Sequence, residues 1–549
     1  MQILLKSFPI SDIFSLGGLE MTTKMFFHCH ASLPFLFLLN NPYFQRKHKE
    51  NARFPLVIRV FLLYLQRILV VINKTMIIGR EKEQRELLSL LEKEESQFCA
   101  VYGRRRVGKT YLIRETFNYQ FCFQHTGVAK GTLRQQLTAF RNSLMAAGMA
   151  KCSIPKSWIE AFELLKQLIN NAPAGKKVLF IDELPWMDTP KGNLIGALES
   201  FWNGWATARR EKDIVLIVCG SATSWISKKL LKDKGGLRGR LTLRIKLVPF
   251  TLRECELFAQ RANLAFGRKD VLELYMILGG IPYYWSFLKK GLSVAQNVDQ
   301  VFFTETAQLR DEFEALYATL FKRPENYLEV IGCLSDGRRS GMTREEILAA
   351  SKLSDGGTFS NILEELEESG FIRHFASADT AETNALYQLI DNYTLFYYLC
   401  IKKNAFSDEH YWLNTCTSSA HNTWKGHAFE RVCLQHVPQI KAALGISGVQ
   451  TNVCSWFVRG SKEQRGAQID LVMQRADGFT DICEMKHSVS TFSIDSDYAK
   501  DLLNKLDAYR ELSKDKRTLH LVMVTTNGVA HNNYYNMVQK EINMDELFT

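Results

Sequence analysis

Short hydrophobic runs alternate with amphipathic stretches through the middle of the chain. Residues 98–102, 178–181 and 214–218 are apolar or nearly so, and each run has the length of a single strand. Continuous apolar strands separated by helical stretches are typical of a parallel sheet covered by helices on both faces. Residues 81–95 place leucines among charged side chains, which predicts an amphipathic helix. The pattern therefore predicts an α/β core at residues 76–250.

After this core the pattern becomes helical and then mixed. Residues 251–310 predict helices only, in the position of a helical lid. Residues 311–404 predict three helices and two short strands, the order of a winged helix, and end in a connecting helix at 391–403. The second of the three helices begins at the capping box Thr343-Arg344-Glu345-Glu346. Residues 405–549 predict a last α/β unit.

The first 75 residues differ from the rest of the chain. They contain an apolar run at 33–39 and a longer one at 54–72, which two arginines and a glutamine interrupt. An arginine near the centre of a bilayer costs about 2.5–3.5 kcal/mol on insertion scales, which disfavours a membrane span. We expect residues 1–75 to be an N-terminal extension ahead of a true start at Met76. A membrane anchor at 54–72 is the alternative.

Composition narrows the class of protein only moderately. The hydrophobic content of 46% and the charged content of 23% are ordinary for a globular protein. A formal net charge of +11 is compatible with a nucleic acid or another anionic partner. The 12 cysteines include no CxxC pair, which argues against a structural zinc site and a disulfide framework. Reduced thiols of this kind favour a cytoplasmic location.

A phosphate-binding motif follows the first predicted strand and opens a helix. It matches GxxxxGK[ST] and consists of Gly103, Arg104, Arg105, Arg106, Val107, Gly108, Lys109 and Thr110. In such a loop the backbone N–H groups surround the phosphates, and the helix N-terminus adds a favourable potential. Lys109 is expected beside the β and γ oxygens, and the Thr110 hydroxyl on Mg²⁺. The motif predicts ATP binding with Mg²⁺.

Polar residues at the ends of the next two predicted strands complete a hydrolytic site. Asp182 and Glu183 follow the strand at 178–181 directly. Ligands bind at the carboxyl ends of strands in such sheets, so we expect Asp182 to hold Mg²⁺ and Glu183 to act as the general base for water. Ser221 follows the third strand and is a candidate for contact with the γ-phosphate or the attacking water, although a simple turn is an equal alternative.

An arginine against the γ-phosphate would stabilise charge in the transition state. Arg240 is the candidate and Arg238 the reserve, within Gly236-Leu237-Arg238-Gly239-Arg240. A solvated basic loop is the equally weighted alternative. If Arg240 acts on a neighbouring chain, a homo-oligomer is required.

Six elements follow one another in a fixed order along the chain: Gly79-Arg80-Glu81, the phosphate-binding loop, Asp182-Glu183, Cys219-Gly220-Ser221, Gly239-Arg240 and Gly280-Ile281-Pro282-Tyr283. Together they resemble the archaeal-type ATPase family of the AAA-like and STAND-like P-loop NTPases, over roughly residues 76–400. The resemblance implies that Ile78 and Arg80 lie near the adenine and that Pro282 faces the nucleotide from the lid. It also implies a basic loop, which Arg104, Arg105 and Arg106 supply.

A second group of acids lies near the C-terminus. Glu484 and Lys486 share one face of a predicted strand, because side chains alternate along a strand, and Asp470 is on the strand before it. Two carboxylates can hold a divalent metal, and a lysine can orient water. Glu430, on a predicted helix, is a candidate third acid. This spacing is similar to the PD-(D/E)xK nuclease core, which is restriction-endonuclease-like, although Ile469 replaces the proline before the first acid.

These features support two readings of function. In the first, an ATPase cycle drives a nuclease-like domain on DNA. In the second, ATP binding sets an assembly state, and the C-terminal domain binds without cutting. The predicted third helix at 358–369 is acidic, which argues against insertion into a DNA groove, whereas Arg338, Arg339 and Arg344 could meet phosphates. Membrane attachment is the weakest alternative.

Overall fold

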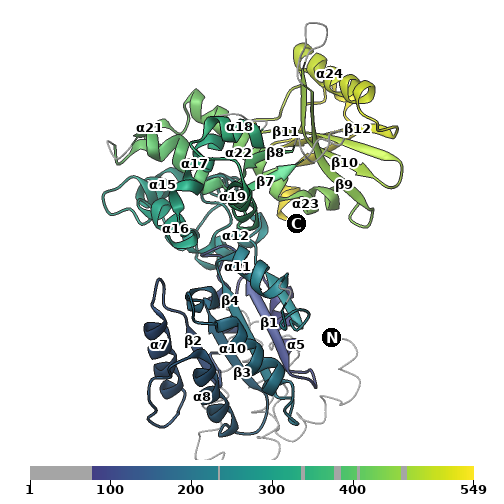
Figure 1. Cartoon of the computed structure of the whole chain (residues 1–549). Helices are drawn as coiled ribbons and strands as arrows, with labels where there is room; N and C mark the ends of the chain where they lie inside the picture. The colour runs from purple at the N-terminus through teal and green to yellow at the C-terminus, as the bar shows by residue number, and fades with distance from the viewer. Residues whose placement is uncertain (1–76, 233–234, 336–340, 376–384, 405–407, 459–465) are drawn as a thin grey trace, which may run out of the picture. The chain divides into compact units, whose positions relative to one another are not determined.

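The computed structural model describes residues 77–232, 235–335, 341–375, 385–404, 408–458 and 466–549 (Figure 1). All of them belong to one compact unit, Ile77–Thr549. The N-terminal extension, with its alternative anchor at 54–72, lies outside the described residues, as do Arg338 and Arg339. Within the described ranges, no helix has the length and hydropathy that a membrane span requires.

The first part of the described chain is built around a parallel five-stranded sheet in the order β2-β3-β4-β1-β5. Its strands are β1 (Gln97–Tyr102), β2 (Phe123–Thr126), β3 (Lys177–Asp182), β4 (Ile214–Gly220) and β5 (Leu243–Lys246). Every residue of β3 and β4 is buried, because these central strands are apolar and covered on both faces. The prediction of an α/β core with a parallel sheet is confirmed.

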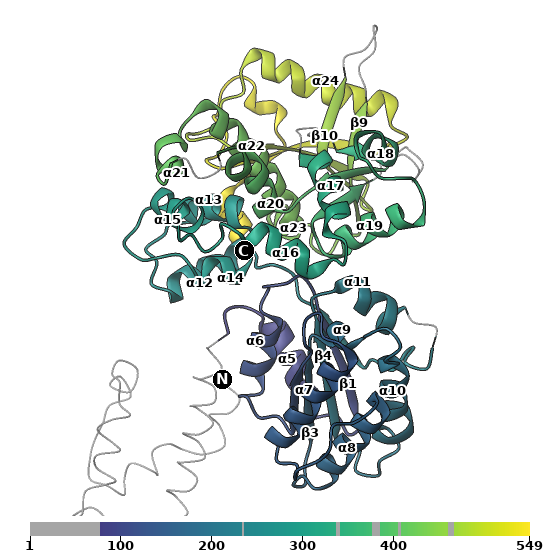
Figure 2. The same cartoon turned by 60° about the vertical axis from the view of Figure 1, so that its left-hand side comes forward.

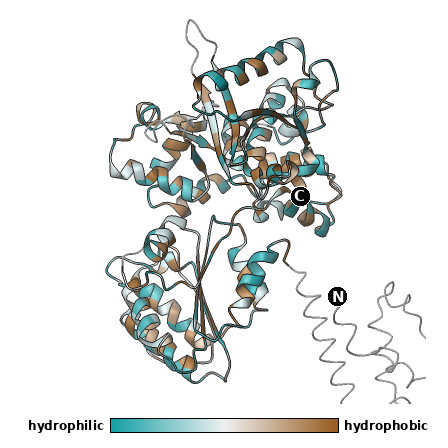
Figure 3. Ribbon diagram, turned by 90° about the vertical axis from the view of Figure 1, so that its right-hand side faces the viewer, coloured by the Kyte–Doolittle hydropathy of each residue, from teal (hydrophilic) through white to brown (hydrophobic). Residues whose placement is uncertain are grey.

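Helices cover both faces of this sheet. One face packs on α7 (Leu133–Ala146), α8 (Trp158–Asn170) and α10 (Leu194–Phe201). The other packs on α5 (Glu81–Ser89) and α6 (Lys109–Thr116). Figure 3 shows hydrophobic strands between helices whose outer faces are hydrophilic.

The first helix is shorter than the sequence predicted. It ends at Ser89 rather than at residue 95. Because β1 already begins at Gln97, the intervening residues turn the chain back toward the sheet, and the leucines at 90 and 91 belong to that turn.

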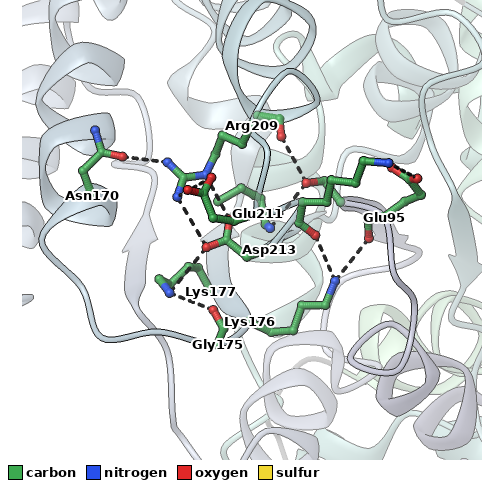
Figure 4. A network of polar contacts seen from close by, with 12 residues as sticks. Glu95, Asn170, Gly175, Lys176, Lys177, Arg209, Glu211 and Asp213 are labelled. Atoms are coloured by element: carbon green, nitrogen blue, oxygen red, sulfur yellow. Dashed lines mark hydrogen bonds and ion pairs between the residues drawn. The ribbon is translucent and has the colours of Figure 1, made fainter.

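The amino-terminal ends of the strands are closed by a polar network (Figure 4). Arg209 Nε donates to Asp213 Oδ1 over 3.0 Å, and Lys177 Nζ lies 3.4 Å from Asp213 Oδ2. Asp213 is buried, and it directly precedes β4. Lys212 pairs with Glu95 just before β1. These contacts fix the end of the sheet that faces away from the phosphate-binding loop.

The region expected to be a helical lid contains helices only. They are α12 (Leu252–Arg261), α13 (Arg268–Leu278), α14 (Pro282–Trp285) and α15 (Val294–Phe302). Gly280 lies between two of them at a point of close approach. A Cβ there would lie 1.9 Å from the carbonyl oxygen of Phe250, so the position requires glycine.

The next segment combines helices with a small antiparallel sheet in the order β6-β8-β7. Its elements are α16 (Glu312–Leu320), α17 (Pro324–Ser335), β6 (Met342–Thr343), α18 (Arg344–Ala350), α19 (Gly357–Glu368), β7 (Ile372–Phe375) and β8 (Leu386–Leu389). The capping box at Thr343 and Glu346 is present at the start of α18, as predicted. The helical stretch predicted at 391–403 is α20 (Asn392–Phe396), continued by π-helical η7 (Tyr397–Ile401) and the 3₁₀ turn η8 (Lys402–Asn404).

The last part holds a second five-stranded sheet, of mixed direction, in the order β13-β12-β11-β10-β9 (Figure 2). The antiparallel strands are β9 (Thr451–Val458), β10 (Ala467–Arg475) and β11 (Phe479–Lys486), and β12 (Thr518–Thr525) and β13 (Lys540–Asn543) continue in parallel to β11. The helices are α21 (Tyr411–Thr415), α22 (Ser419–Gln435), α23 (Val437–Ala443) and α24 (Ser496–Leu512), and two 3₁₀ turns are η9 (Tyr535–Met537) and η10 (Met544–Phe548).

Candidate functional site

The phosphate-binding loop, residues 103–110, connects β1 to α6 through unusual backbone angles. Gly103 has φ +144°, and a Cβ there would lie 2.1 Å from the carbonyl oxygen of Leu247. Arg106 and Gly108 are also left-handed, with φ +70° and +91°. A Cβ at Gly108 would meet no atom within 4 Å, so space for a ligand remains at this turn. The backbone therefore curls at the N-terminus of α6, as a phosphate cradle requires.

Lys109 is buried and folds back over the loop. Its Nζ donates to the carbonyl oxygens of Gly103 and Arg104, both over 2.9 Å. Burial lowers the pKa of Lys109, against the attraction of the neighbouring Cys219, Glu183 and Asp182. The ammonium group of Lys109 thus donates to carbonyl oxygens of the loop in this structure. The sequence predicted that it would contact phosphate oxygens of the nucleotide.

The Thr110 hydroxyl and the Asp182 carboxylate are in contact at the carboxyl end of the sheet. Thr110 Oγ1 donates to Asp182 Oδ2 over 2.9 Å. Asp182 is the buried last residue of β3, and the Cys219 thiol of β4 contacts its other oxygen. A hydroxyl and a carboxylate oxygen side by side are ligands that Mg²⁺ prefers. This pair therefore fits the metal that the sequence predicted.

Glu183 and Ser221 form a second pair at the ends of β3 and β4. The Ser221 hydroxyl donates to the Glu183 carboxylate over 2.7 Å, and the Ser221 backbone N–H donates to Glu183 Oε2 over 3.0 Å. Glu183 has φ +48°, a left-handed angle that costs free energy in a non-glycine residue. The sequence predicted Ser221 against the γ-phosphate or water, whereas here it orients the candidate base.

The structure does not bring Arg240 to the loop. Arg240 and Arg238 are both exposed. In the described part of the chain, no hydrogen bond or ion pair joins the Arg240 side chain to residues 103–110. Its role against the γ-phosphate stays a prediction.

Arg80, which the resemblance places near the adenine base, packs against the segment that follows β5. Arg80 is buried: its Nη2 donates to the Val248 carbonyl over 2.6 Å, and its guanidinium lies 4.9 Å from the ring centre of Phe250. Arg80 therefore anchors the segment that carries half-buried Ile78, and the contact of both residues with the base stays a prediction.

Pro282 is the first residue of α14, and the residue after it reaches the loop. The Tyr283 ring centre lies 4.2 Å from the Arg106 guanidinium carbon. Tyr283 belongs to the sequence element that pointed to Pro282, yet only the structure shows its contact with the loop.

Two of the three loop arginines form ion pairs with acids from distant parts of the chain. Arg104 is buried in an ion pair with Asp391, and Arg106 pairs with buried Glu312. Asp391 lies 287 residues along the chain from Arg104, so no local pattern could have indicated it. The resemblance implied a basic loop, and the structure shows that two of its arginines are paired with acids.

The acidic third helix of the small-sheet segment meets lysines of the core. Lys228 lies 3.2 Å from Glu365 of α19, and Lys232 lies 3.5 Å from both Glu364 and Glu368. The lysines belong to η5 (Ser227–Leu231) and its C-cap, shortly after Ser221. Arg344, predicted to meet phosphates, pairs with Asp355 over 2.5 Å.

The C-terminal acids line a cavity of about 240 Å³. We call it the C-terminal cavity; its charged lining residues include Glu430, Asp470, Glu484, Lys486, Asp501 and Lys505. Asp470 and Glu484 lie one residue beyond the opposed pair Leu471–Cys483 of β10 and β11, which places them on the same face. The predicted juxtaposition of these acids with Glu430 and Lys486 is thus present.

The carboxylate of Glu484 is bonded on both oxygens. Lys505 donates to it over 2.6 Å and Tyr498 over 2.7 Å, and Lys486 lies 3.1 Å away. Burial raises the pKa of Glu484, but the two ammonium groups outweigh burial, and the pKa lies below its usual range. Sequence reasoning missed Lys505 and Tyr498, because both come from α24.

The two other acids that the sequence predicted at this cavity, Asp470 and Glu430, have different hydrogen-bonding or charged neighbours from Glu484. Asp470 accepts from Gln468 Nε2 over 2.7 Å, and burial, reinforced by Glu430, raises the pKa of Asp470. Glu430 Oε2 lies 3.4 Å from His427 Nδ1. Within the described ranges, no three His, Cys, Asp or Glu side chains are grouped so as to hold a metal ion. The three-acid metal site predicted from the sequence is therefore not preformed.

Comparison with known proteins gives the class of the first domain. Residues 77–287 match the model of a family described as an ATPase domain predominantly from Archaea. This part of the chain is an archaeal-type ATPase domain, as the motifs predicted. The uncharacterized protein MJECL04 of Methanocaldococcus jannaschii is 23% identical over 412 residues, which cover 72% of this chain and 84% of that protein.

Two solved structures are similar at a lower level. The Walker-type ATPase PABY2304 of Pyrococcus abyssi is 18% identical, with a TM-score of 0.41, over 58% of this chain and 95% of that one. The ORC2 protein of Aeropyrum pernix, in complexes with ADPNP and ADP, is 13% identical, with a TM-score of 0.37, over 57% of this chain and 90% of that one.

Proposed function

We propose that the ATPase domain binds ATP with Mg²⁺ at residues 103–110 and hydrolyses it, and that this cycle controls a DNA-associated, nuclease-like C-terminal domain. One observation carries the first half. Lys109, the Thr110–Asp182 pair and the Glu183–Ser221 pair converge at the carboxyl ends of β1, β3 and β4. That is where open α/β sheets bind their ligands.

Each residue has a distinct task in this proposal. The loop N–H groups and Lys109 bind the phosphates, and Thr110 with Asp182 would hold Mg²⁺. When bound, the metal would neutralise charge on the β- and γ-phosphate oxygens. Glu183 accepts the proton of the attacking water, and Ser221 holds its carboxylate in place. The left-handed backbone at Glu183 aims that side chain across the strand ends.

Two variants test the proposal. Lys109→Ala should weaken ATP binding, because the phosphates lose their buried cation. Glu183→Gln should keep ATP binding and lose turnover by about 10²–10³-fold, since an amide cannot accept the proton. Binding by calorimetry and phosphate release would be measured on the same samples. Lys212→Ala, at the far end of the sheet, is the control. Normal hydrolysis by both site variants would refute the proposal.

The proposed nuclease-like role of the C-terminal domain rests on the C-terminal cavity. Asp470, Glu484 and Lys486 lie together on β10 and β11, with Glu430 of α22 at the same cavity, which matches the spacing of the nuclease core. The antiparallel β6-β8-β7 sheet with α17, α18 and α19 supports a winged helix between the two ends. Mg²⁺- or Mn²⁺-dependent cutting of DNA, lost in Asp470→Ala and Glu484→Ala, would support a nuclease.

A second candidate function is a nucleotide-dependent switch with a C-terminal domain that binds without cutting. The ion pairs of Glu484 with Lys505 and Lys486 favour it, because they cancel the charge that a metal needs. Intact ATP turnover without DNA cutting would favour this candidate. If the chain also forms a homo-oligomer, it should sediment as a larger species when ATP is present. Loss of that species in Arg240→Ala would support a role for Arg240 between two copies.

A further inference from the structure

The side chain of Arg104 leaves the phosphate-binding loop and is buried against a distant part of the chain. Its guanidinium binds both oxygens of Asp391, with Nη2 donating to Oδ2 over 3.1 Å. The guanidinium carbon also lies 4.5 Å from the ring centre of Phe371. Only 5% of Arg104 and 6% of Asp391 is exposed. A paired and stacked arginine in such surroundings has little freedom, so the backbone at Arg104 is fixed from outside the family-matched residues 77–287.

Arg106 repeats this arrangement two residues later. Its guanidinium pairs with Glu312, the first residue of α16, and lies over the Tyr283 ring. Glu312 also accepts from the Tyr284 hydroxyl over 3.0 Å. Two alternate residues of the loop are therefore held by buried acids that lie outside the family-matched residues 77–287.

Asp391 makes a second contact that extends this link. Its Oδ2 accepts from the Thr394 backbone N–H over 2.9 Å and so caps α20. The adjacent Asn392 donates to the Tyr275 carbonyl of α13 over 3.0 Å. One carboxylate thus joins the loop to the first turn of the helical stretch that runs on through η7 and η8.

Lys109 connects this link to the nucleotide. Its ammonium group donates to the carbonyl oxygen of Arg104 itself. An ATP phosphate that draws the ammonium away would release that carbonyl, and the peptide at Arg104 would then shift together with its side chain. A shift of the backbone is transmitted to Asp391, because a buried bidentate pair moves as one body.

We propose that Asp391, acting through Arg104, is a positioning residue of the ATP site: it sets the loop geometry and transmits nucleotide occupancy to α20. This inference rests on the proposed binding of ATP at residues 103–110. It adds an acid outside the family-matched domain to the determinants of that site.

Binding of a fluorescent ATP analogue, with Mg²⁺, to the full chain tests the positioning role. Asp391→Asn and Arg104→Met should each raise the Kd about tenfold or more, because small displacements of positioning groups are costly. The double variant Arg104→Met/Asp391→Asn should bind no more weakly than either single one, since the two residues act as a unit. Asp213→Asn, which breaks a buried pair at the opposite end of the sheet, should lower the Tm and leave the Kd unchanged.

A variant with an apolar pair separates positioning from stability. Arg104→Met/Asp391→Leu replaces the buried charges by groups that pack, which commonly restores stability. We expect its Tm to approach that of the unchanged protein while its Kd stays raised. A Kd that recovers with the Tm, or single variants with an unaltered Kd, would overturn the positioning role.

Hydrogen exchange tests the transmission. Saturating ATP should change amide exchange in α20 of the unchanged protein, and Arg104→Met at its own saturating ATP concentration should show no such change. An equal response in Arg104→Met would overturn the transmission. Absence of ATP binding by the unchanged protein would instead refute the proposed function, so the two failures are distinguishable.

Discussion

The ATP site and the C-terminal cavity both place two carboxylates together beside a five-stranded sheet, but different groups bond them. In the ATP site, Asp182 accepts from the hydroxyl of Thr110, and Glu183 accepts from that of Ser221. In the C-terminal cavity, Glu484 pairs with the ammonium groups of Lys505 and Lys486.

This difference concerns charge: hydroxyl groups bond the carboxylates that we propose for the ATP site, whereas ammonium groups neutralise Glu484. A hydroxyl orients a carboxylate without cancelling its charge, so Asp182 keeps its attraction for Mg²⁺. An ammonium group satisfies the same oxygens and also cancels the charge. A metal at Glu484 must therefore displace or share with a lysine. The comparison therefore predicts weaker metal-dependent activity when the carboxylate of Asp182 is lost, and tighter metal binding when the ammonium group of Lys505 is lost.

The largest effect should follow from Asp182→Asn. The change keeps the shape of the side chain and removes the charge beside the Thr110 hydroxyl. We expect kcat/KM for ATP hydrolysis to fall by about 10²-fold or more, because a carboxylate ligand of the metal is lost. Phosphate release measured over a range of Mg²⁺ concentrations would show it. Asp188→Asn is a matched control nearby, since its amide oxygen can still accept from Trp225. Equal activity of Asp182→Asn and Asp188→Asn would contradict the proposal that Asp182 binds the metal.

A smaller effect of the opposite kind is expected in Lys505→Met. Loss of one ammonium group should cost about 1–3 kcal/mol of unfolding free energy, because Glu484 loses a charged hydrogen bond and keeps the other lysine. The same variant should bind Mn²⁺ more tightly, since less charge is cancelled. Denaturant unfolding and a metal titration would measure both. Lys500→Met breaks only the exposed pair with Asp497 and should change stability by less than about 1 kcal/mol. Weaker Mn²⁺ binding in Lys505→Met would contradict the proposed competition.

The smallest effect concerns Asp470 and depends on pH. Its pKa in the folded protein is raised above 3.8 by burial and by Glu430. The unfolded chain therefore loses this proton at a lower pH than the folded one, and stability falls as the pH rises above 3.8. Asp470→Asn removes this penalty, so the variant should be the more stable at pH 7, by about 1.4 kcal/mol for each unit of the pKa difference.

Thermal or denaturant unfolding at several pH values would check this sign. The gain should shrink as the pH falls toward 3.8 and vanish well below it, where Asp470 is protonated in both states. Asp477→Asn is the opposite control, because a hydrogen bond from Arg475 lowers the pKa of Asp477 and so gives that residue a stabilising charge. A gain that is independent of pH would mean that packing, and not charge, is responsible.

The sequence predicted the parts of the molecule that depend on local patterns. The apolar strands β1, β3 and β4, the loop at 103–110 and the capping box at Thr343 follow from neighbouring residues, and so does the placement of Asp182 and Glu183 at a strand end. Alternation along β10 and β11 likewise predicted that Asp470 and Glu484 share a face. Such features need only the period of the element and the direction of the sheet.

Partners supplied from distant segments could not be predicted in this way. Asp391 and Glu312 are ordinary acids at helix starts, and nothing near them in sequence refers to the arginines of the loop. Lys505 is one of two lysines on α24, and only the packing of that helix on the sheet brings it to Glu484. The same holds for the side chains of Arg104 and Arg106, because their buried partners Asp391 and Glu312 come from distant segments.

The lysines that hold α19 give the ATPase domain a contact that responds to ionic strength. Side chains of Lys228 and Lys232 are 38% and 64% exposed, so dissolved ions reach them readily. Such exposed pairs contribute little each, and the Debye length falls to about 3 Å at 1 M salt, which is comparable to these separations. We expect concentrated salt or a polyanion to free the acidic face of α19 while leaving the buried Arg104–Asp391 pair intact. The contact between the lysines and α19 should therefore weaken as the salt concentration rises, whereas the Arg104–Asp391 contact should not.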